Sequence, residues 1–394
     1  MNPFEGREVR NTAVLCRLDL NVPLDAGAVA DDTRLEAVLP TVRSLADRGA
    51  RIVLCSHLGR PKGHVVEELR LKPVSERLSH LLGFPVQQIP TTIGDHATAA
   101  VKELEPGHAL LLENLRFHAG ETGHEPAFAD QLAVLGDSFV LDAFGVCHRN
   151  HASVVGLAKR LPTTVGPLIR AELAAFARVL QSPERPFVAV LGGAKVADKI
   201  PVIENLLGQV DAVLVGGAMA NTFMAALGQD MGASLVDHDL VDTAARLIEQ
   251  ARSAGVPFHL PLDLVVTDDI NDPGPSSVVA DVRPGAMAVD IGPATCGAFA
   301  EVIAGARTIV WNGPMGVFEK PPWDEGTRSV AQSICESDAY SVIGGGDSAA
   351  AVRRAGLASQ VGHLSTGGGA SLQLLQGTPL PGLQAAGIAV SSVP

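Results

Sequence analysis

Aromatic residues are scarce in this sequence of 394 residues: they make up 4% of it, although 46% of the residues are hydrophobic. The cores must therefore be built from valine, leucine, isoleucine and alanine. No window approaches the roughly 18 consecutive apolar residues of a membrane-spanning helix, and residues 1–7 lack the apolar core of a signal peptide. We therefore expect a soluble, cytoplasmic protein with no membrane partner.

Cysteine and positive charge are also in short supply. The five cysteines lie far apart and form no Cys-x-x-Cys pair, which argues against a disulfide framework or structural zinc and fits a reducing compartment. The formal net charge is −13. That charge argues against nucleic acid as a general partner, although a local cluster of arginines can still bind a small anion.

Short apolar runs alternate with helical segments along a chain longer than one core of up to about 250–300 residues. This pattern predicts an α/β protein with two doubly wound parallel-sheet (Rossmann-like) domains joined by a helix. The helix lies between proline-rich breaks at 162–167 and 182–186. We place the first domain at 1–165, the joining helix at 166–182 and the second domain at 183–376.

Four predicted strands of the first domain end in or beside an arginine. These arginines are Arg17, Arg60, Arg116 and Arg149, with Arg34 close by. One such residue is most often a surface residue, but four at one edge of a parallel sheet predict a socket for a small, multiply anionic metabolite. His148 and His151 have no carboxylate pair or cysteine nearby, so we interpret them as substrate-shell or structural residues rather than metal ligands.

The second domain opens with an apolar strand, 188–191, that ends in two glycines and a helix carrying Lys195 and Lys199. By itself this could be a glycine turn with two solvated lysines. The chain has only seven lysines against 23 arginines, however, and two of them lie here one helical turn apart. Compact ammonium groups at a strand end favour a site for phosphate oxygens.

Two further glycine clusters each precede a helix. Residues 344–349 match the dinucleotide pattern G-x-G-x-x-A, but Asp347 would repel a phosphate unless a cation lay between them. A carboxylate beside phosphates is typical of a Mg²⁺ site, so we favour a Mg-nucleotide over NAD. Residues 365–370 offer bare amides and a positive helix end to an anion, and no P-loop or protein-kinase motif is present.

Taken together, these motifs resemble the phosphoglycerate kinase family over essentially the whole chain. The stretches that carry the resemblance are Arg17-x-Asp19-x-Asn21-Val22-Pro23, Ser56-His57-Leu58-Gly59-Arg60-Pro61, Leu112-Glu113-Asn114-Leu115-Arg116-Phe117, Asp142-Ala143-Phe144-Gly145, Gly192-Gly193-Ala194-Lys195-Val196-x-Asp198-Lys199, the run 311–319, and the two glycine clusters. The resemblance implies reversible phosphoryl transfer in glycolysis between 1,3-bisphosphoglycerate and MgADP, giving 3-phosphoglycerate and MgATP. It also implies a monomer, hinge closure of two domains, and a tail, 377–394, that returns to the first domain.

The resemblance also implies which residues bind each substrate. Those expected to hold 3-phosphoglycerate are Asp19, Asn21, Arg34, His57, Leu58, Gly59, Arg60, Arg116 and Arg149. Those expected to hold the nucleotide are Lys195, Lys199, Gly292, Asn312, Glu319, Gly345, Gly346, Asp347 and Ser348, with Asp347 on Mg²⁺. Arg34, Lys195 and the amide of Gly368 would stabilise the moving phosphoryl group, which needs position and charge rather than covalent help.

Several positions depart from the family pattern. Ala218 stands where glycine is common, Ser348 replaces threonine, and Gln373 and Gln376 replace glutamates. Two other functions remain open. An NAD-dependent dehydrogenase would need an acidic residue near 362–365, which has none. The presence of Lys195, Lys199 and Asp347 speaks against a non-catalytic phosphometabolite-binding protein.

Overall fold

The computed structural model describes residues 8–272 and 276–388, so residues 1–7 and the end of the predicted tail, 389–394, lie outside the described residues. Within the part that is described, no helix is both long enough and apolar enough to cross a bilayer.

The chain forms two compact units, one of residues 1–174 with 379–394 and the other of residues 175–378. The division falls inside α6 (Pro167–Gln181), the helix between the two proline-rich breaks. In the first unit, Gly382 of α14 (Pro381–Ala385) donates its amide to the carbonyl of Cys147 at 2.9 Å. The last described helix therefore packs on the first unit.

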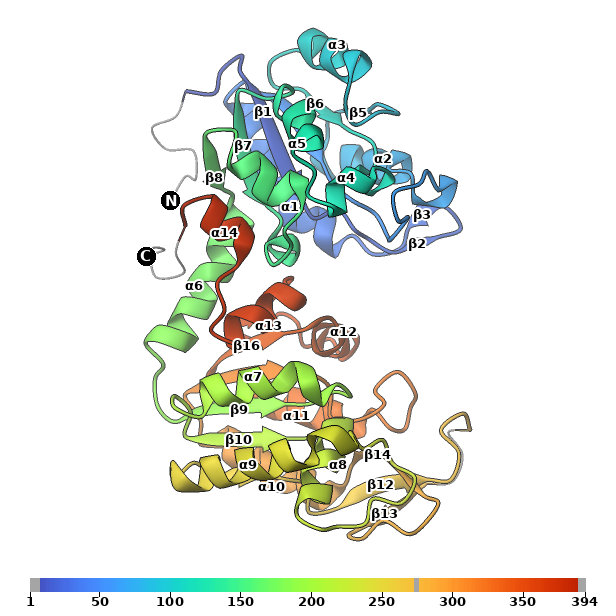
Figure 1. The fold of residues 1–394 in the computed structure, drawn as a ribbon, viewed down its shortest axis with the longest axis vertical. Helices are drawn as coiled ribbons and strands as arrows, with labels where there is room; N and C mark the ends of the chain where they lie inside the picture. The colour runs from blue at the N-terminus through green and yellow to red at the C-terminus, as the bar shows by residue number, and fades with distance from the viewer. Residues whose placement is uncertain (1–7, 273–275, 389–394) are drawn as a thin grey trace. The chain divides into compact units, whose positions relative to one another are not determined.

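The first unit is built on a six-stranded parallel sheet with strand order β5-β6-β4-β1-β7-β8 (Figure 1). The strands are β1 (Ala13–Leu18), β4 (Arg51–Cys55), β5 (Val86–Gln88), β6 (Ala109–Leu111), β7 (Ser138–Asp142) and β8 (Thr163–Val165). The chain moves outward from β1 through β4 and then returns to the other side of β1 with β7. This reversal creates a switch point, beside which ligands bind in open α/β sheets.

Both faces of this sheet are buried, which explains why its strands read as continuous apolar runs. Every residue of β1 is buried. One face packs against α1 (Thr33–Asp47) and α2 (Lys72–Leu82), where Leu35, Val38 and Val42 of α1 belong to the core. The remaining elements are the hairpin β2 (Leu24–Asp25) and β3 (Ala28–Val29), the short helices η1 (Glu67–Leu69), η2 (Leu115–Phe117), η3 (Phe144–Val146) and η4 (Ala152–Gly156), and the helices α3 (Asp95–Glu103), α4 (Ala119–Thr122) and α5 (Pro126–Ala133).

The sequence interpretation needs a correction at 162–167. That stretch, expected only to break the chain, contains the edge strand β8, which pairs with β7 in the parallel sheet. A strand of three residues between two prolines is too short to show a period of its own. Its pairing with β7 is therefore visible only in the folded chain.

The second unit repeats the architecture with the strand order β11-β10-β9-β15-β16-β17, again all parallel. The strands are β9 (Phe187–Leu191), β10 (Ala212–Val215), β11 (Phe258–His259), β15 (Thr308–Asn312), β16 (Tyr340–Gly344) and β17 (His363–Leu364). The helices are α7 (Val196–Leu206), α8 (Gly217–Ala226), η5 (His238–Leu240), α9 (Val241–Ser253), α10 (Pro293–Ala304), α11 (Glu325–Glu336), α12 (Gly346–Arg354) and α13 (Gly369–Leu375). Its switch point lies between β9 and β15.

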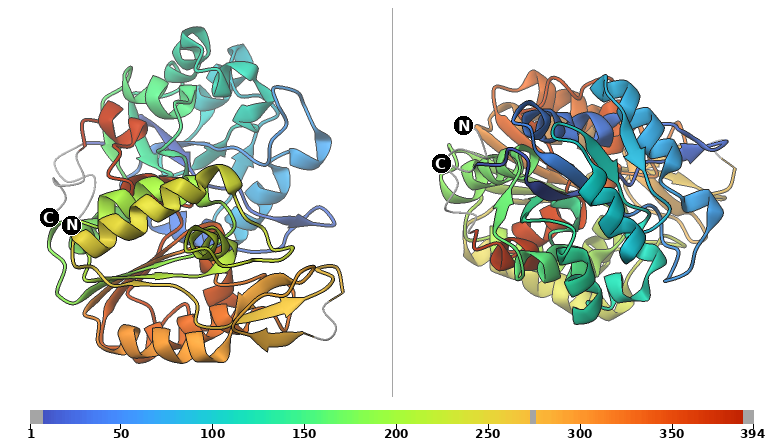
Figure 2. Two further views of the ribbon diagram at one scale, coloured as in Figure 1. Left: turned by 60° about the horizontal axis from the view of Figure 1, so that its bottom comes forward. Right: turned by 90° about the horizontal axis from the view of Figure 1, so that it is seen from above.

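A small antiparallel sheet, β13-β12-β14, accompanies the main sheet of the second unit. Its strands are β12 (Leu264–Thr267), β13 (Ser277–Val279) and β14 (Met287–Ile291), gold to orange in Figure 2. The apolar runs of the second domain were expected to form one parallel sheet, and this was wrong for β14, which pairs antiparallel with β12. An apolar run shows that a strand is buried but not which strand it pairs with, because pairing depends on distant residues.

Candidate functional site

The first unit has a basic cavity of about 490 Å³ at the carboxyl edge of its sheet. Three of the four strand-end arginines line it, because β6, β4, β1 and β7 are parallel neighbours whose ends meet there. The lining residues are Arg60, Lys62, Gly63, Arg116, Ala119, Thr122, Arg149 and His151. Such a cluster of cations without a carboxylate suits a small ligand with several negative charges.

Arg116 is the most constrained of these cations. It donates through Nη1 to the carbonyl of Gly59 at 2.8 Å, while its buried Nε has no hydrogen-bond partner among the described residues. Burial, and then the charge of Arg17, lower the pKa of Arg116 to about 10. The guanidinium stays charged at neutral pH, and a buried donor without an acceptor favours an anionic ligand.

Of the other predicted substrate residues, Asp19 and Asn21 lie in the loop after β1, and Arg34 lies in the first turn of α1. Arg34 pairs with Asp19 at 2.7 Å, and Asn21 accepts the amide of Gly59 through Oδ1 at 2.8 Å. Gly59 has a φ of +61°, and a Cβ there would lie 2.7 Å from Leu69. These contacts tie the loop after β1 to the loop after β4, so the predicted residues are brought together, although Asp19, Asn21 and Arg34 do not line the cavity itself.

His57 and Leu58 lie in the loop after β4, and both are buried. The amide of Leu58 donates to Asn114 Oδ1 at 3.2 Å. His57 is 4% exposed, and its Nδ1 lies 2.9 Å from Nη2 of the fully buried Arg17. Burial, and then the charges of Arg17 and Arg116, hold the pKa of His57 well below its usual value. His57 is therefore neutral, and Arg17 lies beneath the socket rather than in it.

His148 and His151 follow η3 (Phe144–Val146) and differ in their surroundings. Burial, and then the charge of Arg149, lower the pKa of His148 to about 4. Across residues 8–272 and 276–388, no group of three or more His, Cys, Asp or Glu side chains is arranged to hold a metal ion. Of the two, His151 lines the basic cavity.

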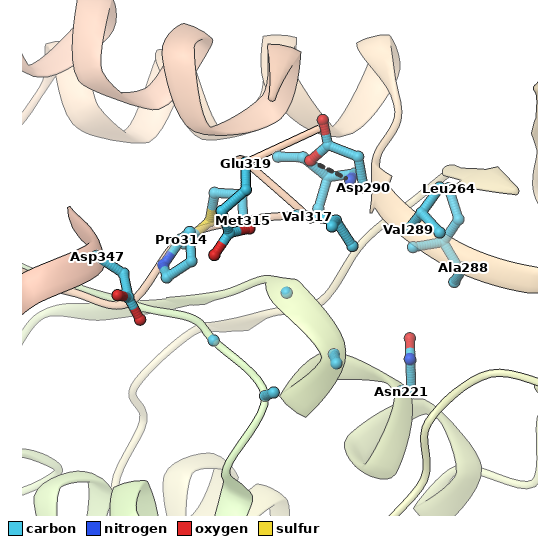
Figure 3. A pocket seen from close by; sticks show the side chains of 16 residues that line it. Asn221, Leu264, Ala288, Val289, Asp290, Pro314, Met315, Val317, Glu319 and Asp347 are labelled. Atoms are coloured by element: carbon cyan, nitrogen blue, oxygen red, sulfur yellow. Dashed lines mark hydrogen bonds between the residues drawn. The ribbon is translucent and has the colours of Figure 1, made fainter. Parts of the chain in front are cut away.

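The second unit has a smaller cavity, of about 260 Å³, at its own switch point (Figure 3). Asp347 and Pro314 lie at one end of the view, and Leu264, Ala288 and Val289 lie at the other. The lining residues are Gly193, Ala194, Gly217, Ala218, Asn221, Leu264, Ala288, Val289, Asp290, Ile291, Pro314, Met315, Gly316, Val317, Glu319 and Asp347. The mostly apolar wall suits a flat ring, and the acidic end at Asp347 would face an anionic group only with a cation between them.

Lys199 of α7 and Lys195, which directly precedes that helix, have different surroundings. Lys199 is 9% exposed, and its ammonium donates to Asn312 Oδ1. Burial lowers the pKa of Lys199 to about 8, although the carboxylates of Asp198 and Asp347 act in the opposite direction. Lys195 is exposed just before the first residue of α7 and makes no hydrogen bond or ion pair with any described residue.

The glycine loops place polar groups near the ends of β15 and β16. Gly345, with a φ of +99°, precedes α12, whose first turn carries the exposed Asp347. Ser348 Oγ accepts the amide of Gly313 at 2.7 Å, so the serine retains a structural hydroxyl contact. Gly346 begins α12, and Gly368, with a φ of +50°, immediately precedes α13.

Three residues that were singled out from the sequence remain to be placed: Gly292, Glu319 and Gln376. Gly292 precedes α10, and a Cβ there would collide with Asp263. Glu319 is exposed and lines the 260 Å³ cavity. Gln376 donates to the carbonyl of Asp198 at 3.1 Å, within the second unit.

Sequence reasoning missed several lining residues. Lys62 lies two residues after Arg60, in a loop from which only Arg60 was predicted to bind the ligand. Asn221 lies on α8, whose sequence is mostly apolar. Asp290, within β14, was not among the predicted site residues. It accepts the amides of Ile291 and Gly326, and burial raises its pKa to about 7. A carboxylate inside an apolar run was the one available signal for this position.

Comparisons with known proteins agree with the geometry. The family model described as phosphoglycerate kinase matches residues 5–378. The chain is 52% identical to a phosphoglycerate kinase of Moorella thermoacetica, over 96% of this chain and 97% of the relative, and 53% identical to one of Herpetosiphon aurantiacus, over 94% and 95%.

Solved structures give the same result. The phosphoglycerate kinase of Coxiella burnetii superposes with a TM-score of 0.86 at 39% identity, covering 97% of each chain. That of Pyrococcus horikoshii OT3 superposes with a TM-score of 0.87 at 34% identity, covering 100% of each chain. Neither a dehydrogenase nor a non-catalytic binding protein is favoured by these relatives. The chain belongs to the phosphoglycerate kinase family.

Proposed function

We propose that the chain transfers a phosphoryl group reversibly between 1,3-bisphosphoglycerate and MgADP, as a glycolytic phosphoglycerate kinase, with residues 1–165 binding the glycerate and residues 183–376 the nucleotide. The observation that carries the assignment of the glycerate side is the convergence of Arg60, Arg116 and Arg149 on one cavity. Guanidinium groups bind phosphate and carboxylate through paired hydrogen bonds, and 3-phosphoglycerate carries both groups.

On the nucleotide side, the apolar wall of the 260 Å³ cavity would hold the adenine, with Ala218 in place of glycine narrowing it slightly. Lys199, Asn312 and the loop 345–348 would hold the phosphates. Lys195 would follow the transferred group, because its ammonium is not engaged by another described residue. Arg34 and the amide of Gly368 would add stabilisation to the same group.

The residues present fit Mg²⁺ that arrives with the nucleotide. Mg²⁺ is commonly held by one or two carboxylates together with substrate phosphates and water. Asp347 supplies one exposed carboxylate at the cavity end, and no cluster of three ligands exists among the described residues. When bound, the ion would neutralise phosphate charge.

A coupled assay of ATP-dependent phosphorylation of 3-phosphoglycerate tests the proposal. We expect turnover that requires Mg²⁺ and both substrates. Purified, folded protein that binds the substrates but never turns over would leave only the non-catalytic alternative.

Arg60→Ala is expected mainly to raise KM for 3-phosphoglycerate, by about tenfold or more, because one charged hydrogen-bonding group leaves the cavity. KM for ATP should change little. Steady-state kinetics with each substrate varied will measure both, with Arg252→Ala, an exposed arginine of α9, as the control. An unchanged KM for 3-phosphoglycerate would argue against the proposed socket.

Nucleotide binding is expected to take up a proton near pH 8. The pKa of Lys199 is about 8 without ligand, and nearby phosphates favour the charged form and raise that pKa. ADP affinity should therefore fall as the pH rises above 8, by up to about tenfold per pH unit. Calorimetry in buffers of different ionisation enthalpy will measure the uptake, which Lys199→Gln should abolish and Lys72→Gln, at an exposed site, should not.

We also propose that the protein is a cytoplasmic monomer without a nucleic-acid partner. The five cysteines are free, three of them buried, and the net charge is −13. Light scattering that gave a mass of twice 40.8 kDa would contradict the monomer.

A further inference from the structure

A chain of four buried polar side chains lies beneath the basic cavity of the first unit. Glu121 on α4, Ser153 on η4 and Arg17 on β1 are each fully buried, and His57 after β4 is 4% exposed. Ser153 donates its amide to Glu121 Oε2 at 2.9 Å and its hydroxyl to Oε1 at 2.6 Å. Arg17 donates from Nε to Ser153 Oγ at 2.9 Å, and its Nη2 lies 2.9 Å from His57 Nδ1.

The donors and acceptors of these four side chains fix the direction of every hydrogen bond between them. Arginine has only donors, so His57 Nδ1 must accept from Arg17 and the ring proton of neutral His57 must be on Nε2. Ser153 Oγ accepts from Arg17 and therefore directs its own proton to Glu121. No described residue hydrogen-bonds to His57 Nε2, although His57 itself does not line the basic cavity.

Glu121 supplies the negative end. Burial raises its pKa, but His151, Arg17 and Ser153 more than offset this, so that the pKa lies below its usual value. His151 Nδ1 lies 3.5 Å from Glu121 Oε1, beyond good hydrogen-bond distance. An ionised carboxylate thus accompanies the buried Arg17 cation, which would otherwise be costly to bury.

We propose that Glu121 and Ser153 are positioning residues, which hold Arg17 so that His57 remains the Nε2–H tautomer and offers a hydrogen-bond donor to an anionic substrate. The inference rests on the proposed function, since it gives His57 a role toward 3-phosphoglycerate. The other tautomer would present a lone pair to that anion and repel it.

A purely electrostatic role for Glu121 makes the opposite prediction. Glu121→Gln removes one negative charge from beneath the cavity, and by charge alone the variant would bind 3-phosphoglycerate more tightly. If Glu121 acts by position, the same variant loosens Ser153 and Arg17 and binds more weakly. The sign of the change therefore separates the two roles.

The first experiment is ¹⁵N NMR of histidine-labelled, ligand-free wild type at neutral pH, with His57→Gln used only to assign the signal. We expect the Nδ1 of His57 to be unprotonated and its Nε2 to carry the proton. A proton on Nδ1, or on both nitrogens, would overturn the proposal. Because no turnover is involved, this result is independent of whether the kinase assignment holds.

The second experiment compares Glu121→Gln and Ser153→Ala with Glu125→Gln, which makes the same charge change at an exposed position four residues away. We expect the first two to raise the Kd for 3-phosphoglycerate about tenfold or more and to give a mixture of His57 tautomers. The control should do neither. Wild-type affinity with an unchanged tautomer in Ser153→Ala, or tighter binding in Glu121→Gln, would overturn the proposal.

Discussion

Replacing Lys195 by alanine is expected to lower kcat about a hundredfold or more, as removal of a charge contact to a transition state does. The ammonium of Lys195 makes no hydrogen bond or ion pair with any described residue, so the substitution should leave thermal stability unchanged. Lys199 differs, because its ammonium is already engaged by Asn312. We therefore expect Lys195 to act on the moving group and Lys199 to act on bound nucleotide.

The assay is steady-state kinetics with both substrates saturating, together with a thermal melt. Lys195→Arg keeps the charge but changes its geometry, so it should recover only part of the rate. Lys159→Ala, at an exposed position of the first unit, is the matched control. A wild-type kcat in Lys195→Ala would remove Lys195 from the mechanism.

The two main sheets could be predicted from the sequence because their strands are buried on both faces. Strands such as β9 and β15 read as continuous apolar runs, and each ends in a glycine-containing loop. The separate sheet of β12, β13 and β14 could not be predicted, since its strands read much like the others. Which strands pair is decided by tertiary packing, which a local pattern does not contain.

The candidate site was predictable where strand ends carried charge, and less so where burial decides the role. Arg17 and Arg60 both follow an apolar run, but one is fully buried and the other is exposed at the cavity. Nothing in the local sequence separates them. Glu121 was not noticed either, because a carboxylate on a short polar helix gives no sign that it will meet Ser153 across 32 positions of chain.

Gly313→Ala is expected to destabilise the second unit by about 3 kcal/mol or more, from backbone strain at positive φ together with overpacking. Gly313 has a φ of +98°, and a Cβ there would collide with the carbonyl group of Gly192. The close approach of Gly313 to Gly192 fixes the position of the next residue, Gly193, whose amide donates to the carbonyl of Pro314 at 2.8 Å. The loop that leads to Lys195 should therefore shift, and nucleotide affinity should fall as well.

Tryptophan fluorescence during denaturation will measure this effect in the second unit alone. The chain has two tryptophans, Trp311 and Trp323, and both are buried in that unit. Gly208→Ala is the matched control, because a Cβ there meets no atom within 4 Å and its φ is not positive. We expect the control to change the free energy of unfolding by no more than about 0.5 kcal/mol. Equal stability of the two variants would show that the loop at Gly192 yields to a methyl group, and the close approach would then not be what holds Lys195 in place.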